Sequence, residues 1–164
     1  MKKYTNEELQ EILRLHKMWL NNEPGGKRAD LRGSNLRGSN LSGSNLSDSD
    51  LRDSDLRDSN LRHSNLSGSN LRGSNLSGSN LSDSNLRGAE LDYSCLPLWC
   101  GSLSAHFDDR QLKQIAYHLV NAGLQSKNAS AETKRELSKL IDFANGFHRV
   151  GECGKIVFKE GDTP

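Results

Sequence analysis

The cysteines and histidines of this chain are its candidate zinc ligands. Cys95 and Cys100 are separated by four residues, a spacing that one pair of zinc ligands can have. No second regular pair follows them, because the downstream candidates are scattered: His106, His118, His148 and Cys153. Buried structural thiols explain the same cysteines, and we expect no metal and no other cofactor.

Serine is the other residue type here that could do chemistry, and its spacing is regular. Serines recur every five residues through the middle of the chain, and about half of their hydroxyls should point inward. No nucleophile elbow surrounds any of them, and no glycine-rich phosphate loop lies between a strand and a helix. We therefore expect no enzymatic activity and assign no catalytic residue.

These serines belong to a repeat in which leucine occupies every fifth position. Two residues before each leucine stands Ser or Ala, and the residue just before it is mostly Asn or Asp. The leucines expected to fill a core are Leu31, Leu36, Leu41, Leu46, Leu51, Leu56, Leu61, Leu66, Leu71, Leu76, Leu81, Leu86, Leu91 and Leu96. Such a short fixed period indicates stacked units that bury their apolar side against their neighbours.

The period of five excludes the two common regular structures. On an α-helix each leucine would step by about 140°, and on a flat strand successive leucines would point to opposite faces. A chain that turns once per unit places every leucine on one axis, and the intervening Gly, Ser, Asn and Asp suit tight turns. A disordered linker fits the composition, but disorder does not require an unbroken leucine column.

Three units show a family resemblance most clearly: residues 29–33, 34–38 and 49–53. Their pattern resembles the pentapeptide repeat family, whose consensus is Ala-Asp/Asn-Leu-x-x. The resemblance implies a mainly β fold, a right-handed quadrilateral β-solenoid with four units per coil. Fourteen units across residues 29–98 then give about 3.5 coils.

A period of twenty aligns arginines on the outside of such a solenoid. The aligned residues are Arg32, Arg52 and Arg72 in one column and Arg37 and Arg57 in another. Aspartates stand among them, so exposed ion pairs contributing about 0–1 kcal/mol each are one interpretation. A recognition ladder that contacts a partner is the other.

The N-terminal segment, residues 1–24, is expected to form a helix that covers the open first coil. Thr5 and Glu8 make a capping box, and apolar residues recur along a helix of about residues 5–21, before Pro24 breaks it. Such a helix would shield unpaired strand edges. A helix on a membrane surface is the alternative, and its glutamates oppose anionic lipid.

Residues 99–148 are expected to form a helical pair that closes the other end. Asp108 with Gln111 starts the first helix, which ends at Gly123, and Ser130 starts the second, which runs to Gly146. By resemblance to the family, these helices would form a homodimer. Its expected face comprises Leu112, Ile115, Leu119, Leu137, Leu140 and Ile141. The alternative is a monomer whose helices fold back on each other.

The remaining residues, 149–164, are expected to be a tail. Within it, Ile156, Val157 and Phe158 are expected either to form a short edge strand or to belong to a loose tail. Net charge is +1, no run of eighteen apolar residues occurs and the cysteine number is odd. These features predict a soluble cytoplasmic protein with no membrane segment.

Two non-catalytic functions fit the sequence. The first is a scaffold that presents polar ladders to an unknown protein partner. The second is a DNA mimic that inhibits DNA gyrase or another DNA-binding protein. It follows from the resemblance, because the quinolone-resistance pentapeptide proteins mimic duplex DNA and inhibit DNA gyrase. Residues 29–93 hold seven arginines, eight aspartates and one glutamate, a net charge of −2, which is low for a mimic of phosphate. Direct nucleic-acid binding is not expected.

Overall fold

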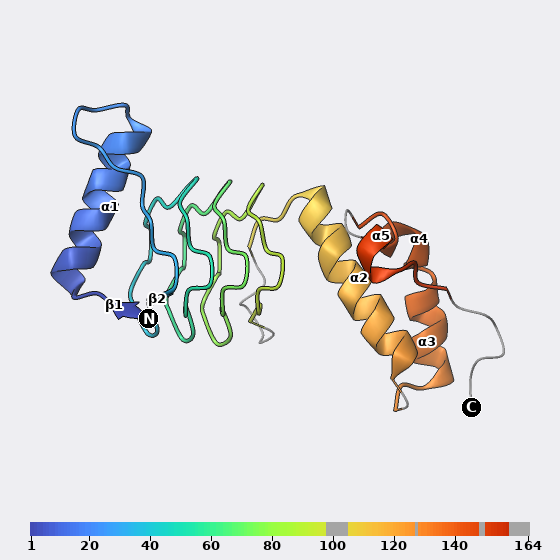
Figure 1. Ribbon diagram of the computed structural model, residues 1–164. Helices are drawn as coiled ribbons and strands as arrows, with labels where there is room; N and C mark the ends of the chain where they lie inside the picture. The colour runs from blue at the N-terminus through green and yellow to red at the C-terminus, as the bar shows by residue number, and fades with distance from the viewer. Residues whose placement is uncertain (98–104, 127, 148–149, 158–164) are drawn as a thin grey trace. The chain divides into compact units, whose positions relative to one another are not determined.

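The computed structural model describes residues 1–97, 105–126, 128–147 and 150–157. The chain divides into two compact units, Met1–Phe107 and Asp108–Pro164. The first unit contains stacked coils with a helix at one end, and the second unit consists of helices (Figure 1).

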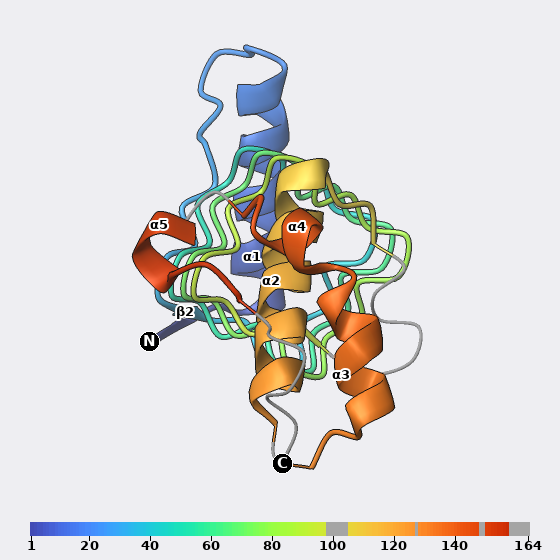
Figure 2. The ribbon, with the colours of Figure 1, turned by 90° about the vertical axis from the view of Figure 1, so that its right-hand side faces the viewer.

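Stacked coils of twenty residues make up most of the first unit. Parallel bridges join each residue before a central leucine to its equivalent twenty positions later, as in Asp30↔Asp50 and Asn45↔Asn65. Viewed along the stack, the coils superpose as four-sided outlines (Figure 2). Backbone hydrogen bonds alternate in direction between coils: Leu51 N–H donates to Asn70 O at 2.8 Å, and Asn70 N–H donates to Ser49 O at 2.9 Å.

Leucine side chains fill the interior of these coils. Every central leucine from Leu31 to Leu91 is at most 5% exposed, and Leu96 packs against the same core while partly exposed. Most of the inward serines form a local hydrogen bond, in which the hydroxyl donates to the carbonyl of the preceding leucine. Ser64 Oγ, for example, lies 2.6 Å from Leu61 O. Ser39 and Ser49 are the two buried exceptions among the described residues.

Each five-residue unit ends in a turn whose corner residue has a positive φ. Ser34 N–H donates to Leu31 O, and Gly33, at the corner between them, has φ +58°. Glycine reaches this left-handed region without steric cost, and Asp tolerates it better than most residues. The corners without glycine are Asp48, Asp53, Asp58, His63, Asp83 and Tyr93.

The N-terminal segment lies against the first coil. Strand β1 (Lys2–Lys3) pairs in parallel with β2 (Ser34–Asn35), and helix α1 (Asn6–Leu20) follows. Thr5 and Glu8 form the expected capping box at the start of α1. Leu9 is 4% exposed and belongs to the same core cluster as the leucine column.

The last turn of the solenoid extends beyond the expected boundary at residue 98. Leu86 N–H donates to His106 O, and His106 N–H donates to Ser84 O, so residue 106 adds a rung next to Asn85. Ala105 and Phe107 pack against the leucine core. The periodicity ends before this segment, which is why the sequence pattern did not include it.

The second unit contains helices α2 (Asp109–Gln125), α3 (Ala131–Ser138), α4 (Ile141–Ala144) and α5 (Val150–Cys153). The expected single helix from Ser130 to Gly146 is interrupted, because the chain turns at residues 139–140 and α4 packs against α2. Helix α2 also continues two residues past Gly123, its expected end. The core of this unit comprises Tyr117, Val120, Ala144, Phe147 and Ile156.

The expected tail is therefore partly structured. Helix α5 lies within it, and Ile156 is 6% exposed in the core of the second unit. Ile156 N–H and O both bond to the Asn145 side-chain amide, so residues 156–157 form no strand. Phe158 lies outside the described residues.

Candidate interaction surfaces

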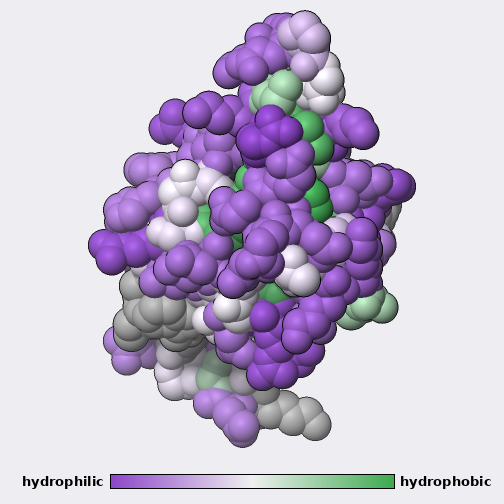
Figure 3. Space-filling view, turned by 90° about the vertical axis from the view of Figure 1, so that its left-hand side faces the viewer, coloured by the Kyte–Doolittle hydropathy of each residue, from purple (hydrophilic) through white to green (hydrophobic). Residues whose placement is uncertain are grey.

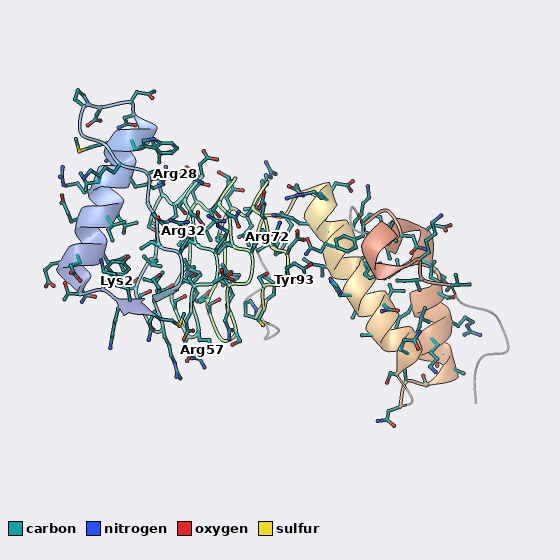
Figure 4. The ribbon with its side chains drawn as sticks, in the orientation of Figure 1. Lys2, Arg28, Arg32, Arg57, Arg72 and Tyr93 are labelled. Carbon is teal, nitrogen blue, oxygen red and sulfur yellow. The ribbon has the colours of Figure 1, made fainter. Side chains whose placement is uncertain are left out.

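The expected recognition ladder lies on the outer faces of the solenoid. Arg32, Arg52 and Arg72 occupy equivalent positions on three successive coils, and Arg37 and Arg57 occupy equivalent positions on two successive coils of the neighbouring face. Figure 4 shows Arg32 and Arg72 spaced along the solenoid, with Arg57 extending outward elsewhere on the coils. The ladder arrangement thus exists in the structure, and its use in recognition stays a prediction.

Three of these arginines are held by an aspartate of their own unit. In the sequence Asp-Leu-Arg the two polar side chains lie on the same side of the leucine and form a bidentate pair. Arg52 donates to Asp50 through Nε at 2.9 Å and through Nη2 at 2.6 Å. The pairs Asp30–Arg32 and Asp55–Arg57 have the same geometry.

These pairs stabilise the ionised form of the aspartates. The hydrogen bond from Arg57 lowers the pKa of Asp55 to about 2, and Arg32 and Arg52 lower the pKa values of Asp30 and Asp50. Arg32 Nε also lies 3.6 Å from Asp50 Oδ2, which links two coils. The positive charges of Arg32, Arg52 and Arg57 are therefore largely neutralised within the solenoid.

Where asparagine replaces the aspartate, the arginine finds another partner or none. Arg37 pairs with Asp58 at 3.1 Å. Arg72 lies 3.9 Å from Asp92 and 6.0 Å from the Tyr93 ring centroid. Within the described part of the chain, Arg62 and Arg87 form no ion pair. The difference between Asp-Leu-Arg and Asn-Leu-Arg is visible in the sequence and identifies the self-neutralised units.

His16 joins α1 to the first coil and was not among the residues singled out in the sequence. Its ring is 0% exposed and stacks on Trp19 with centroids 5.5 Å apart. Ala29 N–H donates to Nδ1 at 3.2 Å, and Nε2 lies 3.0 Å from Ser47 O. Its position between Ile12 and Leu20 on the apolar stripe of the helix was the available signal.

Of the residues expected at a dimer face, half are exposed and half are packed to some degree in the second unit. Leu112, Leu119 and Leu140 are 46%, 59% and 44% exposed. Leu137 and Ile141 pack against the core of the second unit, and Ile115 is half-buried. Any contact formed by this face would therefore depend mainly on the exposed leucines of α2.

The possible zinc ligands are not brought together by the part of the chain that the structure describes. Cys95 is exposed, and no three His, Cys, Asp or Glu side chains of the described residues lie close enough to hold a metal ion. Cys100 and His148 lie outside the described residues. None of the described helices has the length and apolar character needed to cross a membrane.

The sequence family agrees with the coil geometry. The profile of pentapeptide repeats matches residues 27–62 and 64–97, in eight copies. The solenoid is a pentapeptide-repeat domain. This repeat implies a right-handed β-helix, in line with the four-sided coil of the structure. No curated protein sequence matches the chain.

Solved structures similar to the pentapeptide-repeat solenoid include three that differ in source. The protein alr5209 from Nostoc Pcc 7120 is 24% identical, with 58% of this chain and 93% of that chain covered and a TM-score of 0.28. Rfr23 from Cyanothece 51142 is 30% identical, with 52% and 65% covered and a TM-score of 0.22. QnrB1, a plasmid-mediated fluoroquinolone resistance protein, is 22% identical, with 57% and 53% covered and a TM-score of 0.29. This chain thus spans about half of QnrB1.

Proposed function

We propose that the chain is a non-catalytic cytoplasmic scaffold for protein interactions, and that it forms a homodimer through α2. The observation that carries this proposal is the exposure of Leu112 and Leu119 on a helix whose opposite side is already buried. Tyr117 and Val120 on that opposite side are 3% and 0% exposed. Helix α2 therefore has two apolar faces, and its own unit covers one of them.

The exposed face has the spacing of a helix–helix contact. Leu112, Ile115 and Leu119 follow each other at intervals of three and four residues, so they form one stripe along α2. Contiguous exposed apolar surface on a folded protein commonly marks an interaction site. A second copy of α2 offers a matching stripe, as an isologous dimer requires.

The charge pattern supports a scaffold over the alternative, a DNA mimic that inhibits gyrase or another DNA-binding protein. A mimic needs a dense run of unpaired negative charges, about one per 1.7 Å of duplex. Asp30, Asp50 and Asp55 instead form short ion pairs with arginines of their own units. The outer faces then present neutral pairs at fixed spacing, which suits contacts with a protein.

We also propose that β1 and α1 act together as the N-terminal cap of the solenoid. Leu9 enters the leucine core, His16 bonds to the first coil and β1 pairs with β2. Each of these contacts takes the place of one that a preceding coil would make with the first coil. The cap protects the first coil from edge-to-edge association.

The dimer is tested by measuring mass with light scattering at tens of micromolar protein. We expect twice the 18.2 kDa chain mass for the wild type and the chain mass itself for the double variant Leu112→Glu/Leu119→Glu. Val157→Glu is the control, because Val157 is 74% exposed in the same unit but lies off α2. A wild-type mass of 18.2 kDa would reject the dimer.

The choice between scaffold and mimic is tested with a DNA gyrase supercoiling assay. A scaffold should leave supercoiling unchanged at micromolar protein. Inhibition that survives in Arg37→Gln but is lost in Asp53→Asn would identify the solenoid acids as the active groups, and it would replace the scaffold by the mimic.

A further inference from the structure

The first coil has an edge on which backbone groups face away from the stack. Inside the solenoid, Asn60 N–H donates to Ser39 O at 2.9 Å, and Asn60 O accepts from Leu41 N–H at 2.8 Å. Asn65 makes the equivalent bonds with Ser44 and Leu46. By this repeat, the N–H and C=O groups of Asn40 and Asn45 point toward the side where no further coil exists.

Two parts of the same edge are already occupied. Strand β1 pairs with β2, and Ser47 O lies within hydrogen-bond distance of the His16 ring. Between these two parts, the N–H groups of Asn40 and Asn45 and the carbonyl of Ser42 form no hydrogen bond with any described residue. This stretch is therefore an open strand edge of the kind that accepts another strand.

A groove runs along this open stretch. The coil contributes residues 40–45, and α1 contributes Gln10, Leu13, Arg14 and Lys17. Figure 3 shows the solenoid end that carries α1 as a largely hydrophilic surface with narrow hydrophobic strips. The groove thus combines backbone hydrogen-bonding groups, the half-buried Leu13 and two cationic side chains.

The charge of the groove is positive. Arg14 shares its charge with Glu11 through a 2.7 Å ion pair, whereas Lys17 forms no ion pair with the described residues. An acidic side chain on a bound segment would supply the missing partner. Of the two cations, Lys17 is the one whose charge is not already paired with a described carboxylate.

We propose that this groove binds an extended acidic peptide segment of a protein partner, which adds to the open edge at Asn40–Asn45 as β1 adds to β2. Backbone bonds to Asn40, Ser42 and Asn45 hold the segment, and Lys17 selects its acidic side chain. The inference rests on the proposed scaffold function and names the surface and the chemistry of its partner.

The first test uses hydrogen exchange of the wild-type full-length chain with a blocked pentapeptide, Thr-Val-Glu-Val-Thr, as the probe. In the free protein, the amides of Asn40 and Asn45 should exchange at least tenfold faster than those of Asn60 and Asn65, which are bonded in the ladder. The peptide at saturation should slow the first pair and leave the second pair unchanged. Equal protection of both pairs in the free protein would overturn the proposal.

The second test changes the groove and the probe in matched pairs. Wild type should prefer the Glu peptide over Thr-Val-Lys-Val-Thr by about threefold, the size of one exposed ion pair, and Lys17→Glu should reverse that preference. Asn40→Pro removes an edge-facing N–H that forms no ladder bond and also the Oδ1 acceptor of Ser42 N–H, so it should abolish binding, whereas Asn40→Ala, which removes the acceptor alone, should bind like the wild type. Unchanged preference in Lys17→Glu, or chemical shift changes mapping away from residues 40–45, would overturn the groove.

The outcome separates this inference from the proposed function. A dimeric protein that binds neither peptide at millimolar concentration loses the groove and keeps the α2 contact. A monomeric protein that binds the Glu peptide at residues 40–45 keeps the groove and loses the dimer. Binding of a second copy at the edge would appear as concentration-dependent protection of Asn40 without peptide, and it would replace the acidic partner.

Discussion

His16 replaces a coil at the beginning of the solenoid by bonding to Ser47. Its Nε2 lies 3.0 Å from Ser47 O, the carbonyl that would accept a backbone N–H if another coil preceded it. Because Ala29 N–H donates to Nδ1, that nitrogen carries no hydrogen, and Nε2 is the donor to Ser47. One neutral imidazole in one tautomer therefore satisfies two backbone groups of the first coil.

This arrangement predicts a pH-dependent stability. Burial lowers the pKa of His16 below its ordinary value of 6.5, and the nearby Arg28 adds to this, while the Ser47 carbonyl and Asp48 act in the opposite direction. The unfolded chain then binds a proton at higher pH than the folded chain, so the free energy of unfolding should fall as pH decreases below 6.5. This loss of stability can be measured from the thermal midpoint of the solenoid between pH 5 and 8.

A non-titrating variant provides the control for this prediction. His16→Gln keeps an acceptor and a donor at the same site, so the pH slope should flatten. His106→Gln removes an exposed histidine and should leave the slope as in the wild type. A slope that persists in His16→Gln would assign the effect to other groups.

The sequence predicted the parts of this fold that repeat and the helix starts that carry a local capping signal, such as Thr5 and Glu8, and it missed the contacts that depend on where distant elements are placed. The leucine column and the inward position of the serines follow from a pattern that is the same in every unit, so the geometry of one unit predicts that of the others. His16 has no such repetition, because its partners Ala29 and Ser47 are known only when α1 is placed on the coil. The turn at residues 139–140 likewise depends on packing between α2 and α4, since both sides of it have helical periodicity.

The candidate surfaces follow the same division. The alignment of Arg32 with Arg52 was predictable from a period of twenty, but the partner of each arginine depends on whether Asp or Asn stands two residues earlier. The open edge at Asn40 could not be predicted, because it depends on where β1 and His16 stop covering the first coil.

The corner glycines give a second prediction, which separates backbone strain from steric contact. Gly38 and Gly73 share φ +67°, so alanine at either should cost about 1–2 kcal/mol of unfolding free energy. Nothing lies within 4 Å of a Cβ built at Gly38, whereas one at Gly73 meets Asp53 Oδ1 of the preceding coil. Urea denaturation should therefore show a larger loss for Gly73→Ala, and Asp53→Gly should remove the difference. Equal losses in both variants would show that the aspartate moves aside freely.

The inward serines give a third prediction, with opposite signs at two similar sites. Ser64 Oγ donates to Leu61 O, so Ser64→Ala should lose about 1 kcal/mol of unfolding free energy. Ser49 Oγ is buried without a hydrogen-bond partner among the described residues, and Ala29 and Ala89 occupy the same column. Ser49→Ala should therefore be neutral or stabilising by up to about 1 kcal/mol. Equal destabilisation of the two variants in urea would imply a partner for Ser49.

The Asp55–Arg57 pair gives the fourth prediction, at acidic pH. The hydrogen bonds from Arg57 lower the pKa of Asp55 from 3.8 to about 2. Because the folded carboxyl binds its proton at lower pH than the unfolded one, its contribution to stability is present above pH 3.8 and is lost as pH falls toward 2. A carbon NMR titration of the Asp55 carboxyl should give the low value directly.

The variant Arg57→Gln should return the pKa of Asp55 toward 3.8 and reduce the loss of stability between pH 4 and 2. Arg62→Gln is the matched control, because Arg62 follows an asparagine and forms no ion pair with the described residues, so the Asp55 titration should not change. If the pKa of Asp55 stays low in Arg57→Gln, the backbone N–H of residue 57 holds the carboxylate ionised, and the Arg57 guanidinium does not lower this pKa.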